Sequence, residues 1–315
     1  MPGGRPGGGR RRIVRIVTGI GGCGLLLLAY ASVLEPRRLQ ILRYQLGVPD
    51  LPPALEGVRI AHLTDFHVGM AGTRRSTLRR ALDIARSWSP DVVALTGDFV
   101  HNGRWERGAG LFTDLARTTP TLAVLGNHDY RDSAQSTSTI VSALQAEGVQ
   151  VLRNVHRVVR LRQGDGEIAF VAVDDPSLGR DNLTAAMAGL PTTREPRRPT
   201  VLLGHAPDIV DQAPPDRFAL TLAGHTHGGQ LRFSPFKRRT PLELPMIAGG
   251  LDSAYARGTH LVNGNPLFVN SGLGVSGIPL RFLAPPQVAC FTLTRTIDKT
   301  KDADDPERFL TEIPN

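Results

Sequence analysis

Apolar residues in most of the chain follow two spacings, and together these predict short strands that alternate with amphipathic helices. Residues 58–63 form an apolar run of strand length, and residues 91–96 form a second. Between these runs, apolar residues recur at the spacing of one helix face, at Leu78, Ala81, Leu82, Ala85 and Trp88. This order is typical of an α/β fold in which helices pack on the outside of sheets.

The same alternation continues through the rest of the chain. We expect further strands at 121–125, 155–161, 168–173, 200–203, 219–223, 266–270 and 288–294, and helices near 104–117, 137–147 and 181–189. The strand-rich later part predicts mixed rather than purely parallel sheets. Residues 228–258 form a long connection rich in Gly and Pro, and loops of this length are usually functional or mobile.

The N-terminal part of the chain has a different pattern. Residues 16–34 are nineteen residues without a charge, and about 20 apolar residues suffice to span a bilayer. Five arginines precede this run and three follow it, so the positive-inside bias favours a cytoplasmic N-terminus. We therefore expect a single-pass anchor in the cell membrane, with the body of the protein outside the cytoplasm.

A cleaved signal is the alternative interpretation of this segment. Ala29-Tyr30-Ala31 has the small-x-small form of a signal peptidase site, and the adjacent arginines resemble a twin-arginine signal. Cleavage would make the rest of the chain a secreted protein. A buried core helix is disfavoured, because the segment is terminal and has basic flanks.

The net charge of +8 is concentrated at the N-terminus. Residues 1–43 hold eight arginines against one glutamate, so the remainder of the chain is close to neutral. A nucleic-acid partner is therefore not expected. The two cysteines, Cys23 and Cys290, lie in the hydrophobic segment and in a late strand, which excludes a disulfide framework or a cysteine-based metal site.

Five short polar motifs directly follow predicted strands. They are Asp65-Phe66-His67, Gly97-Asp98, Gly126-Asn127-His128-Asp129, Gly204-His205 and Gly224-His225-Thr226-His227. Ligands of α/β sheets bind beyond the carboxyl ends of strands, so these motifs are expected to share one site.

The residue types in these motifs indicate a metal centre. Imidazoles, carboxylates and an amide oxygen suit Mn, Fe or Zn, and suit Mg less well. One ion needs about three or four protein ligands, whereas at least seven candidates are present here. Two ions about 3.5–4 Å apart can bind a phosphoryl group during an in-line displacement, and their excess positive charge favours an anionic substrate.

The motifs resemble the calcineurin-like metallophosphoesterase family, whose blocks read D-x-H, GD, GNH(D/E), GH and GHxH in this order. All five are present over residues 65–227. The resemblance implies an α/β fold, a four-layer α-β-β-α sandwich with mixed sheets, here preceded by one N-terminal hydrophobic helix. We expect this domain at 56–295, after a basic segment at 1–15, the anchor or signal at 16–34 and a linker at 35–55; residues 296–315 are predicted to be a flexible tail.

The resemblance also implies a role for each motif residue. It assigns one metal ion to Asp65, His67 and His227. It assigns the other to Asn127, His205 and His225, with Asp98 bridging the two ions. His128 would donate a proton or hydrogen bond to the leaving oxygen, and Asp129 would orient the ring of His128.

The expected activity is hydrolysis of a phosphodiester, phosphomonoester or pyrophosphate by metal-bound hydroxide. The hydrophobic segment, residues 226–230 and residues 272–277 are similar to a bacterial membrane-associated branch that includes YkuE-like and YaeI-like phosphodiesterases. Some members of this branch act on lipid-linked pyrophosphates such as UDP-diacylglucosamine, so a lipid-linked substrate is among the expectations.

Two other functions are alternatives to hydrolysis by this family. A dinuclear hydrolase of the β-lactamase-like fold is disfavoured, because its H-x-H-x-D-H block does not match His225-Thr226-His227-Gly228-Gly229. A membrane-attached, non-catalytic scaffold or binding protein with the same fold is the remaining alternative; it would be favoured by loss of a motif residue, and none is lost.

The other polar candidates have structural interpretations. Ordinary surface or core positions are expected for four histidines, His62, His101, His156 and His260. Asp174 and Asp175 would cap a turn or the helix near Asn182 rather than extend the site. The basic stretch 232–239 is expected to be a solvated loop rather than a segment that docks on an anion. Arg281 would face either water or a substrate anion.

Overall fold

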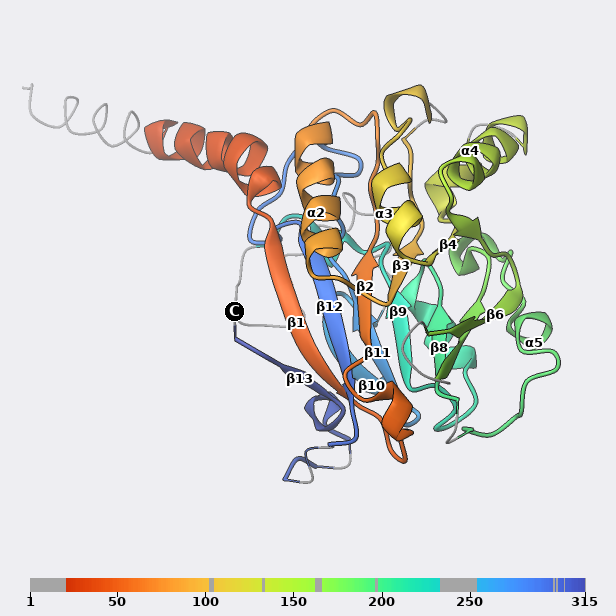
Figure 1. Cartoon of the computed structure of the whole chain (residues 1–315). Coiled ribbons are helices and arrows are strands. Elements are labelled where there is room, and N and C mark those ends of the chain that lie inside the picture. Colours follow the sequence, from red (N-terminus) through yellow and green to blue (C-terminus); the bar gives the residue numbers. More distant parts are fainter. Residues whose placement is uncertain are drawn as a thin grey trace, which may run out of the picture.

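Two mixed β-sheets pack face to face in the computed structural model of the chain, and helices cover their outer faces (Figure 1). The structure describes residues 21–101, 105–131, 134–161, 166–195, 198–232, 254–296, 298, 300–302 and 304–314. The predicted four-layer α-β-β-α sandwich is confirmed by this arrangement.

The first sheet has seven strands in the order β13-β1-β12-β2-β3-β4-β5. The strands are β1 (Gln40–Gly47), β2 (Arg59–Leu63), β3 (Val92–Thr96), β4 (Thr121–Val124), β5 (Gln150–Val151), β12 (Gln287–Thr294) and β13 (Leu310–Glu312). Strands β2 to β5 are parallel, and β12 pairs antiparallel with β2. The carboxyl ends of β2, β3 and β4 therefore lie at one edge.

The second sheet has six strands in the order β10-β11-β9-β8-β7-β6. The strands are β6 (Val155–Arg160), β7 (Glu167–Ala172), β8 (Thr200–Leu203), β9 (Leu220–Ala223), β10 (Gly258–Val262) and β11 (Asn265–Val269). Strands β7, β8, β9 and β11 are parallel, and the two outermost strands are antiparallel to their neighbours. The mixed sheets predicted from the strand-rich later part are confirmed.

Clusters of buried apolar side chains hold the layers together. Side chains of both sheets, such as Phe170 and Phe291, fill the space between the sheets. The outer face of the first sheet is covered by α2 (Arg75–Ser87), α3 (Thr113–Thr118) and α4 (Ala134–Ala146). The second sheet is covered by α5 (Leu183–Ala186) and η7 (Pro207–Gln212). Burial of these apolar faces is the main stabilising term of such a sandwich.

Short helical turns connect these elements. They are η1 (Tyr30–Leu34), η2 (Glu35–Arg37), η3 (Pro53–Leu55), η4 (Trp105–Arg107), η5 (Asn127–Tyr130), η6 (Pro176–Leu178), η8 (His227–Gly229) and η9 (Pro306–Arg308). The single helix predicted near 104–117 is wrong, because the chain forms η4 and then α3. Gly110 lies between them with a φ of 71°, a left-handed backbone conformation that ends a regular helix.

Two predicted boundaries differ from the structure. The linker expected at 35–55 contains β1, which inserts between β12 and β13 and buries Leu42, Tyr44 and Leu46. The tail expected at 296–315 contains β13, whose Leu310 is buried in the core between the sheets. In β1, Leu42, Tyr44 and Leu46 alternate with polar residues, which is the period of a strand, whereas β13 has only three residues, too few to show a period.

The helix at residues 21–29 projects away from the two sheets (Figure 1). Residues 21–29 are helical and continue into η1. Their leucines face solvent; Leu25 is 70% exposed and Leu26 is 73% exposed. None of the helices in the described part of the chain is long and apolar enough to cross a membrane. Residues 16–20 of the predicted anchor lie outside the described residues.

We expect Leu310→Ala to lower the free energy of unfolding by about 2–5 kcal/mol, because it removes buried methyl groups from the core between the sheets. Chemical denaturation would measure the change. The control is Glu312→Ala in the same strand, whose exposed side chain predicts a change within about 0.5 kcal/mol. Equal, negligible effects of both substitutions would mean that the C-terminal strand does not belong to the sheet.

Candidate metal centre

The five polar motifs converge where the carboxyl edges of the two sheets meet. Asp65 and His67 follow β2, Asp98 follows β3, and Asn127 and His128 lie in η5 after β4. The second sheet contributes His205 after β8 and His225 and His227 after β9. Most of these side chains are buried. The structure therefore brings the sequence-predicted residues together at one place.

Asp65, His67 and His227 form one compact group of ligand atoms. The Nε2 atoms of His67 and His227 are 3.0 Å apart. Oδ1 of Asp65 lies 3.4 Å from Nε2 of His227 and 3.9 Å from Nε2 of His67. Three ligand atoms from two segments, those after β2 and β9, thus surround one small volume.

Asp98 lies between this group and a second one. Its Oδ2 atom is 3.3 Å from Nε2 of His67 and 3.3 Å from Nε2 of His205. Nδ1 of His225 is 3.2 Å from the same nitrogen of His205. The other oxygen of Asp98 accepts a hydrogen bond of 2.8 Å from the backbone N–H of His128. One carboxylate oxygen of Asp98 is therefore close to histidine nitrogens that come from both sheets.

The pattern of hydrogen bonds around the cluster fits bound cations. Nδ1 of His205 donates to the carbonyl oxygen of Thr96 at 2.7 Å. In the neutral ring, Nε2 is then an acceptor that faces the acceptor Oδ2 of Asp98. Buried Oδ1 of Asp65 and Oδ1 of Asn127 have no hydrogen-bond partner among the described residues. A divalent cation satisfies such lone pairs, and a histidine ligand typically donates its second N–H to a carbonyl.

Electrostatics within the cluster are dominated by burial and by its own charges. Burial raises the pKa of Asp65 to about 7, although the charge of His205 opposes this shift. Burial also acts on Asp98, but the imidazoles of His205 and His67 outweigh it and hold the pKa of Asp98 well below its usual range. Buried groups so close together need shared protons or cations to balance their charges.

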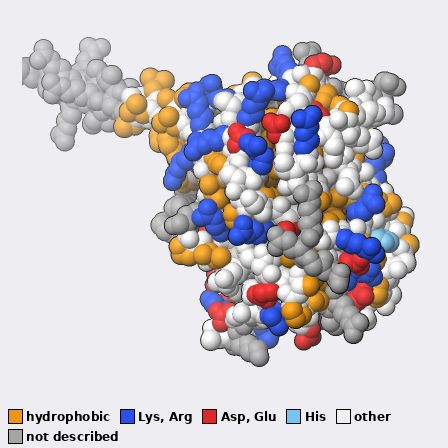
Figure 2. Space-filling model, viewed as in Figure 1, with side chains coloured by type: hydrophobic (Ala, Val, Ile, Leu, Met, Phe, Trp, Pro, Cys, Tyr) orange, Lys and Arg blue, Asp and Glu red, His pale blue; other side chains and the backbone are white. Residues whose placement is uncertain are grey.

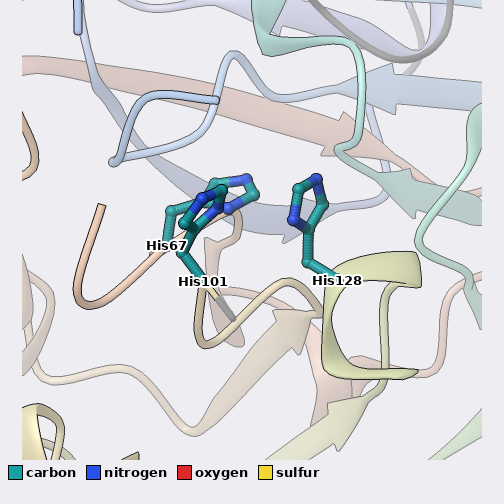
Figure 3. A group of neighbouring side chains, drawn as sticks. All are labelled: His67, His101 and His128. Atoms are coloured by element: carbon teal, nitrogen blue, oxygen red, sulfur yellow. The ribbon is translucent and has the colours of Figure 1, made fainter. Parts of the chain in front are cut away.

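His128 lies beside this group, together with a histidine whose position was not expected (Figure 3). Rings of His128 and His67 are perpendicular, with centroids 4.6 Å apart. His101 stacks on His128 with centroids 5.4 Å apart, and one nitrogen from each of the three histidines could serve one cation. Burial lowers the pKa of His128 to about 4.

His101 was expected at an ordinary surface or core position, and the structure places it beside His128 at the edge of the cluster. His101 follows Asp98 by three residues in the segment after β3, and its backbone N–H bonds to the carbonyl of Val68. This contact aligns the segment with the one that carries His67. Its nearness to Asp98 in the chain was the available signal, but no block of the family includes this position.

Asp129 does not have the partners that a ring-orienting carboxylate needs. Its Oδ1 accepts from the backbone N–H groups of Phe99 and Val100, and its Oδ2 accepts from Gly126. Successive residues of the turn η5 point in different directions, so Asp129 faces the strand ends while His128 faces the cluster. Its carboxylate joins the segment after β3 to the turn after β4.

Arg281 also differs from both of its predicted environments. The side chain is fully buried and donates to the carbonyl oxygens of Ser271, Gly274 and Ala284. One of its nitrogens lies 3.3 Å from Nδ1 of His227. Arg281 therefore meets neither water nor a site open to substrate; it holds the 271–284 segment against the ring of His227.

The segments at 226–230 and 272–277 are bound to each other. The side-chain amide of Gln230 donates to the carbonyl of Ser276 at 2.8 Å and accepts from its N–H at 2.8 Å. Oγ of Ser276 is 3.4 Å from Nε2 of His128. The amide thus links the segment after β9 to the surroundings of His128.

Backbone conformation at the cluster is unusual for residues with side chains. Five of the converging residues have a φ between 42° and 70°, namely Asp65, His67, Asp98, His225 and His227. Such left-handed residues cost free energy and gather at functional sites. The backbone at Gly126 also approaches Asp98 so closely that only glycine fits, because a Cβ atom on Gly126 would lie 2.3 Å from Oδ1 of Asp98.

The remaining candidates have structural roles. His62 bonds to Thr96, His156 to the carbonyl of Ala186 and His260 to that of Arg257, as expected for ordinary histidines. Asp175 caps η6, and Asp174 binds Tyr130 and Arg153, which confirms the capping interpretation for Asp175. Asn182 itself caps α5. Residues 233–239 of the basic stretch, and most of the 228–258 connection, lie outside the described residues.

Comparison with known proteins agrees with the geometry. Residues 58–229, more than half of the chain, match the family model described as calcineurin-like phosphoesterase. The metallophosphoesterase YkuE of Bacillus subtilis is 29% identical over 85% of this chain and 90% of its own length. The phosphodiesterase YaeI of Escherichia coli is 26% identical over 84% and 92%. The UDP-2,3-diacylglucosamine pyrophosphatase LpxG of Chlamydia trachomatis is 25% identical over 84% and 92%.

We expect Asp129→Asn to destabilise the protein by about 1–3 kcal/mol, because the amide nitrogen cannot accept the hydrogen bond that one carboxylate oxygen receives. Denaturant unfolding of the protein would measure it. A carboxylate that mainly oriented His128 would instead leave stability unchanged and lower only the rate of phosphoester hydrolysis.

Proposed function

The chain belongs to the calcineurin-like phosphoesterase family, and we propose that it hydrolyses a phosphodiester, phosphomonoester or pyrophosphate at a centre of two divalent cations. The position of Asp98 is the observation that carries this proposal. Its Oδ2 is 3.3 Å from a histidine nitrogen in each of two ligand groups. A carboxylate in this position can bridge two ions, and a single-ion site does not need it.

The proposal assigns each ion to a set of ligands. One ion is held by Asp65, His67 and His227, and the other by Asn127, His205 and His225. Asp98 is shared. Imidazole, carboxylate and amide donors without a thiolate favour Mn, Fe or Zn. When bound, two such ions lower the pKa of water and neutralise the oxygens of a phosphoryl group.

His128 is the proposed proton donor to the leaving oxygen. Its backbone N–H is fixed by Asp98, and Oγ of Ser276 is 3.4 Å from its Nε2 atom. His128 is 5% exposed, and its ring borders the buried ring of His67 at the edge of the ligand groups. His101 flanks its ring and restricts the orientations that the ring can adopt.

The class of ester is proposed from relatives. YaeI is named a phosphodiesterase, and LpxG is named a pyrophosphatase of a diacylated nucleotide sugar. Both names support a substrate with a bridging phosphate and an organic group on each side. A non-catalytic scaffold is disfavoured, because no motif residue is substituted and six of the motif side chains lie in the groups of neighbouring ligand atoms, namely Asp65, His67, Asp98, His128, His205 and His227.

We expect Asp98→Ala to abolish binding of both ions and to remove hydrolysis of bis-p-nitrophenyl phosphate, because both ligand groups lose their common oxygen. We expect His128→Ala to retain the metal and to lower kcat by about 10²–10⁴-fold, the usual contribution of a general acid. Metal analysis and steady-state kinetics on the Mn-loaded protein measure both results.

His62→Asn is a matched control for the substitution of a buried histidine, because His62 bonds to Thr96 outside the ligand groups. It should retain the metal, with kcat for the diester changed less than about threefold. Stoichiometric metal without turnover of any phosphoester in the wild type would favour the scaffold. Absence of metal, with activity that survives both substitutions, would disprove the ligand assignment.

We also propose that the N-terminal segment attaches the enzyme to the cell membrane with the metal centre outside the cytoplasm. The exposed leucines and the arginines that flank residues 16–34 support this location. Cleavage after Ala31 and secretion is the alternative.

We expect the full-length protein to sediment with membranes, and a variant without residues 1–34 to be soluble. Protease added to intact spheroplasts should digest the body of the full-length protein. Recovery of a shortened chain in the medium would instead indicate a cleaved signal, and protection from protease would place the body in the cytoplasm.

A further inference from the structure

Three imidazoles meet beside the two proposed ligand groups, and one of them belongs to none of the five motifs. His67, His101 and His128, here called the histidine trio, each offer one ring nitrogen, and these nitrogens lie within 4.8 Å of one another (Figure 3). The ring centroids of His67 and His101 are 6.2 Å apart. The trio is therefore a further group of possible metal ligands, which the two-ion assignment does not use as a set.

Backbone hydrogen bonds hold the histidine trio in place. The segments after β2 and β3 run side by side and are joined by a parallel bridge. The N–H of His67 bonds to the carbonyl of Asp98 at 2.9 Å, and the N–H of His101 bonds to the carbonyl of Val68 at 3.0 Å. His128 joins the same segment, because its N–H donates to Oδ1 of Asp98. All three imidazoles are thus attached to one support, which reduces the cost of gathering them around an ion.

Two members of the trio have a buried nitrogen that the rest of the protein does not use. Nδ1 of His67 and Nδ1 of His128 have no hydrogen-bond partner among the described residues. Both side chains are buried, and buried polar atoms are normally paired. His67 can serve two ligand groups, because its Nε2 faces His227 while its Nδ1 is unused. Unpaired nitrogens beside a third imidazole indicate a ligand that the chain alone does not supply.

The donors of the trio are all imidazoles, and this decides which ion fits them. Zinc binds three imidazoles and a water in a tetrahedral site, whereas manganese prefers oxygen ligands. Each of the two proposed ligand groups, in contrast, includes an oxygen donor. The nitrogens of a tetrahedral zinc site are about 3.4 Å apart, since Zn–N bonds are about 2.0–2.1 Å long. A small rotation of the half-buried ring of His101 closes the trio to this separation.

Few other histidines compete with the trio for zinc. Lys and Arg side chains cover much of the face shown in Figure 2, and histidine is scarce on it. His156 and His260 are half-buried like His101, but each bonds to a backbone carbonyl. Neither belongs to a group of three possible metal ligands in the part of the chain that the structure describes.

We propose that the histidine trio binds a third divalent cation, zinc in preference to manganese, and that this ion inhibits the enzyme. Coordination holds the ring of His128 on the third ion, and a ring held there cannot also approach the leaving oxygen. The site shares His67 with the first ion, and repulsion between the cations makes it the weakest of the three sites. The inhibitory effect rests on the proposed function, whereas the binding site does not.

Metal binding at equilibrium tests the proposal. The full chain, without a histidine tag, is dialysed against buffered solutions of rising free zinc or manganese. Metal per chain is measured by mass spectrometry, and hydrolysis of bis-p-nitrophenyl phosphate is followed in the same solutions. We expect zinc to bind with one ion per chain more than manganese, and the rate to fall as this extra ion binds. Manganese should give neither the extra ion nor inhibition at high concentration.

His101→Phe keeps an aromatic ring beside His128 but removes a ligand nitrogen. We expect it to lose the extra zinc ion and to raise the inhibition constant of zinc at least about tenfold, because loss of even an outer partner of a metal ligand typically weakens binding about 10–100-fold. His101→Asn is the second variant, should His101→Phe unfold. His156→Asn is the matched control for a half-buried histidine and should retain both the extra ion and the inhibition. Each inhibition constant is taken relative to the variant's own rate before the extra ion binds.

The outcomes separate two failures. Equal numbers of zinc and manganese ions per chain, or an extra zinc ion that survives both substitutions of His101, overturn the third site and leave the proposed function intact. An extra ion that binds without lowering the rate overturns its inhibitory role. A metal-loaded wild type without turnover of any phosphoester overturns the proposed function itself, and the number of bound zinc ions then still decides on the third site.

Discussion

Close packing of buried acceptor atoms around Asp98 is the constraint on which the rest of the site depends. One carboxylate oxygen lies 3.3 Å from the nitrogens of two histidines on different sheets. Desolvated carboxylates and imidazoles are costly unless protons or cations lie between them. Because the ring of His205 already donates through its other nitrogen to Thr96, its neutral form offers only a lone pair to the cluster. Cations between these groups would compensate the carboxylate charges and the nitrogen lone pairs without any movement of the strands.

Holding the acceptors in place requires an inflexible support, and the fold supplies it from several directions. The ligands follow strands that are buried within their sheets, and the backbone turns sharply after each strand end. Gly272 shows how tight the packing is: a Cβ atom there would lie 2.5 Å from Cβ of Asp65. Asp129 and Arg281 then bind the returning segments through backbone groups. Free energy of folding is thereby used to position the ligands before any ion binds.

Much of this could be predicted from sequence, because strand ends and polar motifs coincide. The strand at 200–203 was predicted with its exact bounds, and His205 follows it at the expected edge. Nothing local marks β13, whose pairing with β1 depends on residues more than 250 positions earlier. The partners of Asp129 and Arg281 are backbone groups, which carry no sequence signal. The position of His101 beside His128 could not be predicted, because it depends on how the segments after β2 and β3 align.

The loop at 275–282 has more contacts than a simple connection between strands. Ser276 meets His128, Arg281 reaches His227 and the carbonyl of Ala31, and Phe282 packs on Tyr30. A displacement of the N-terminal helix therefore cannot be absorbed by a free linker; it would disturb the surroundings of both histidines. The buried guanidinium of Arg281 makes the loop stiff, since each of its donors would lose a carbonyl partner in water-free surroundings if the loop moved.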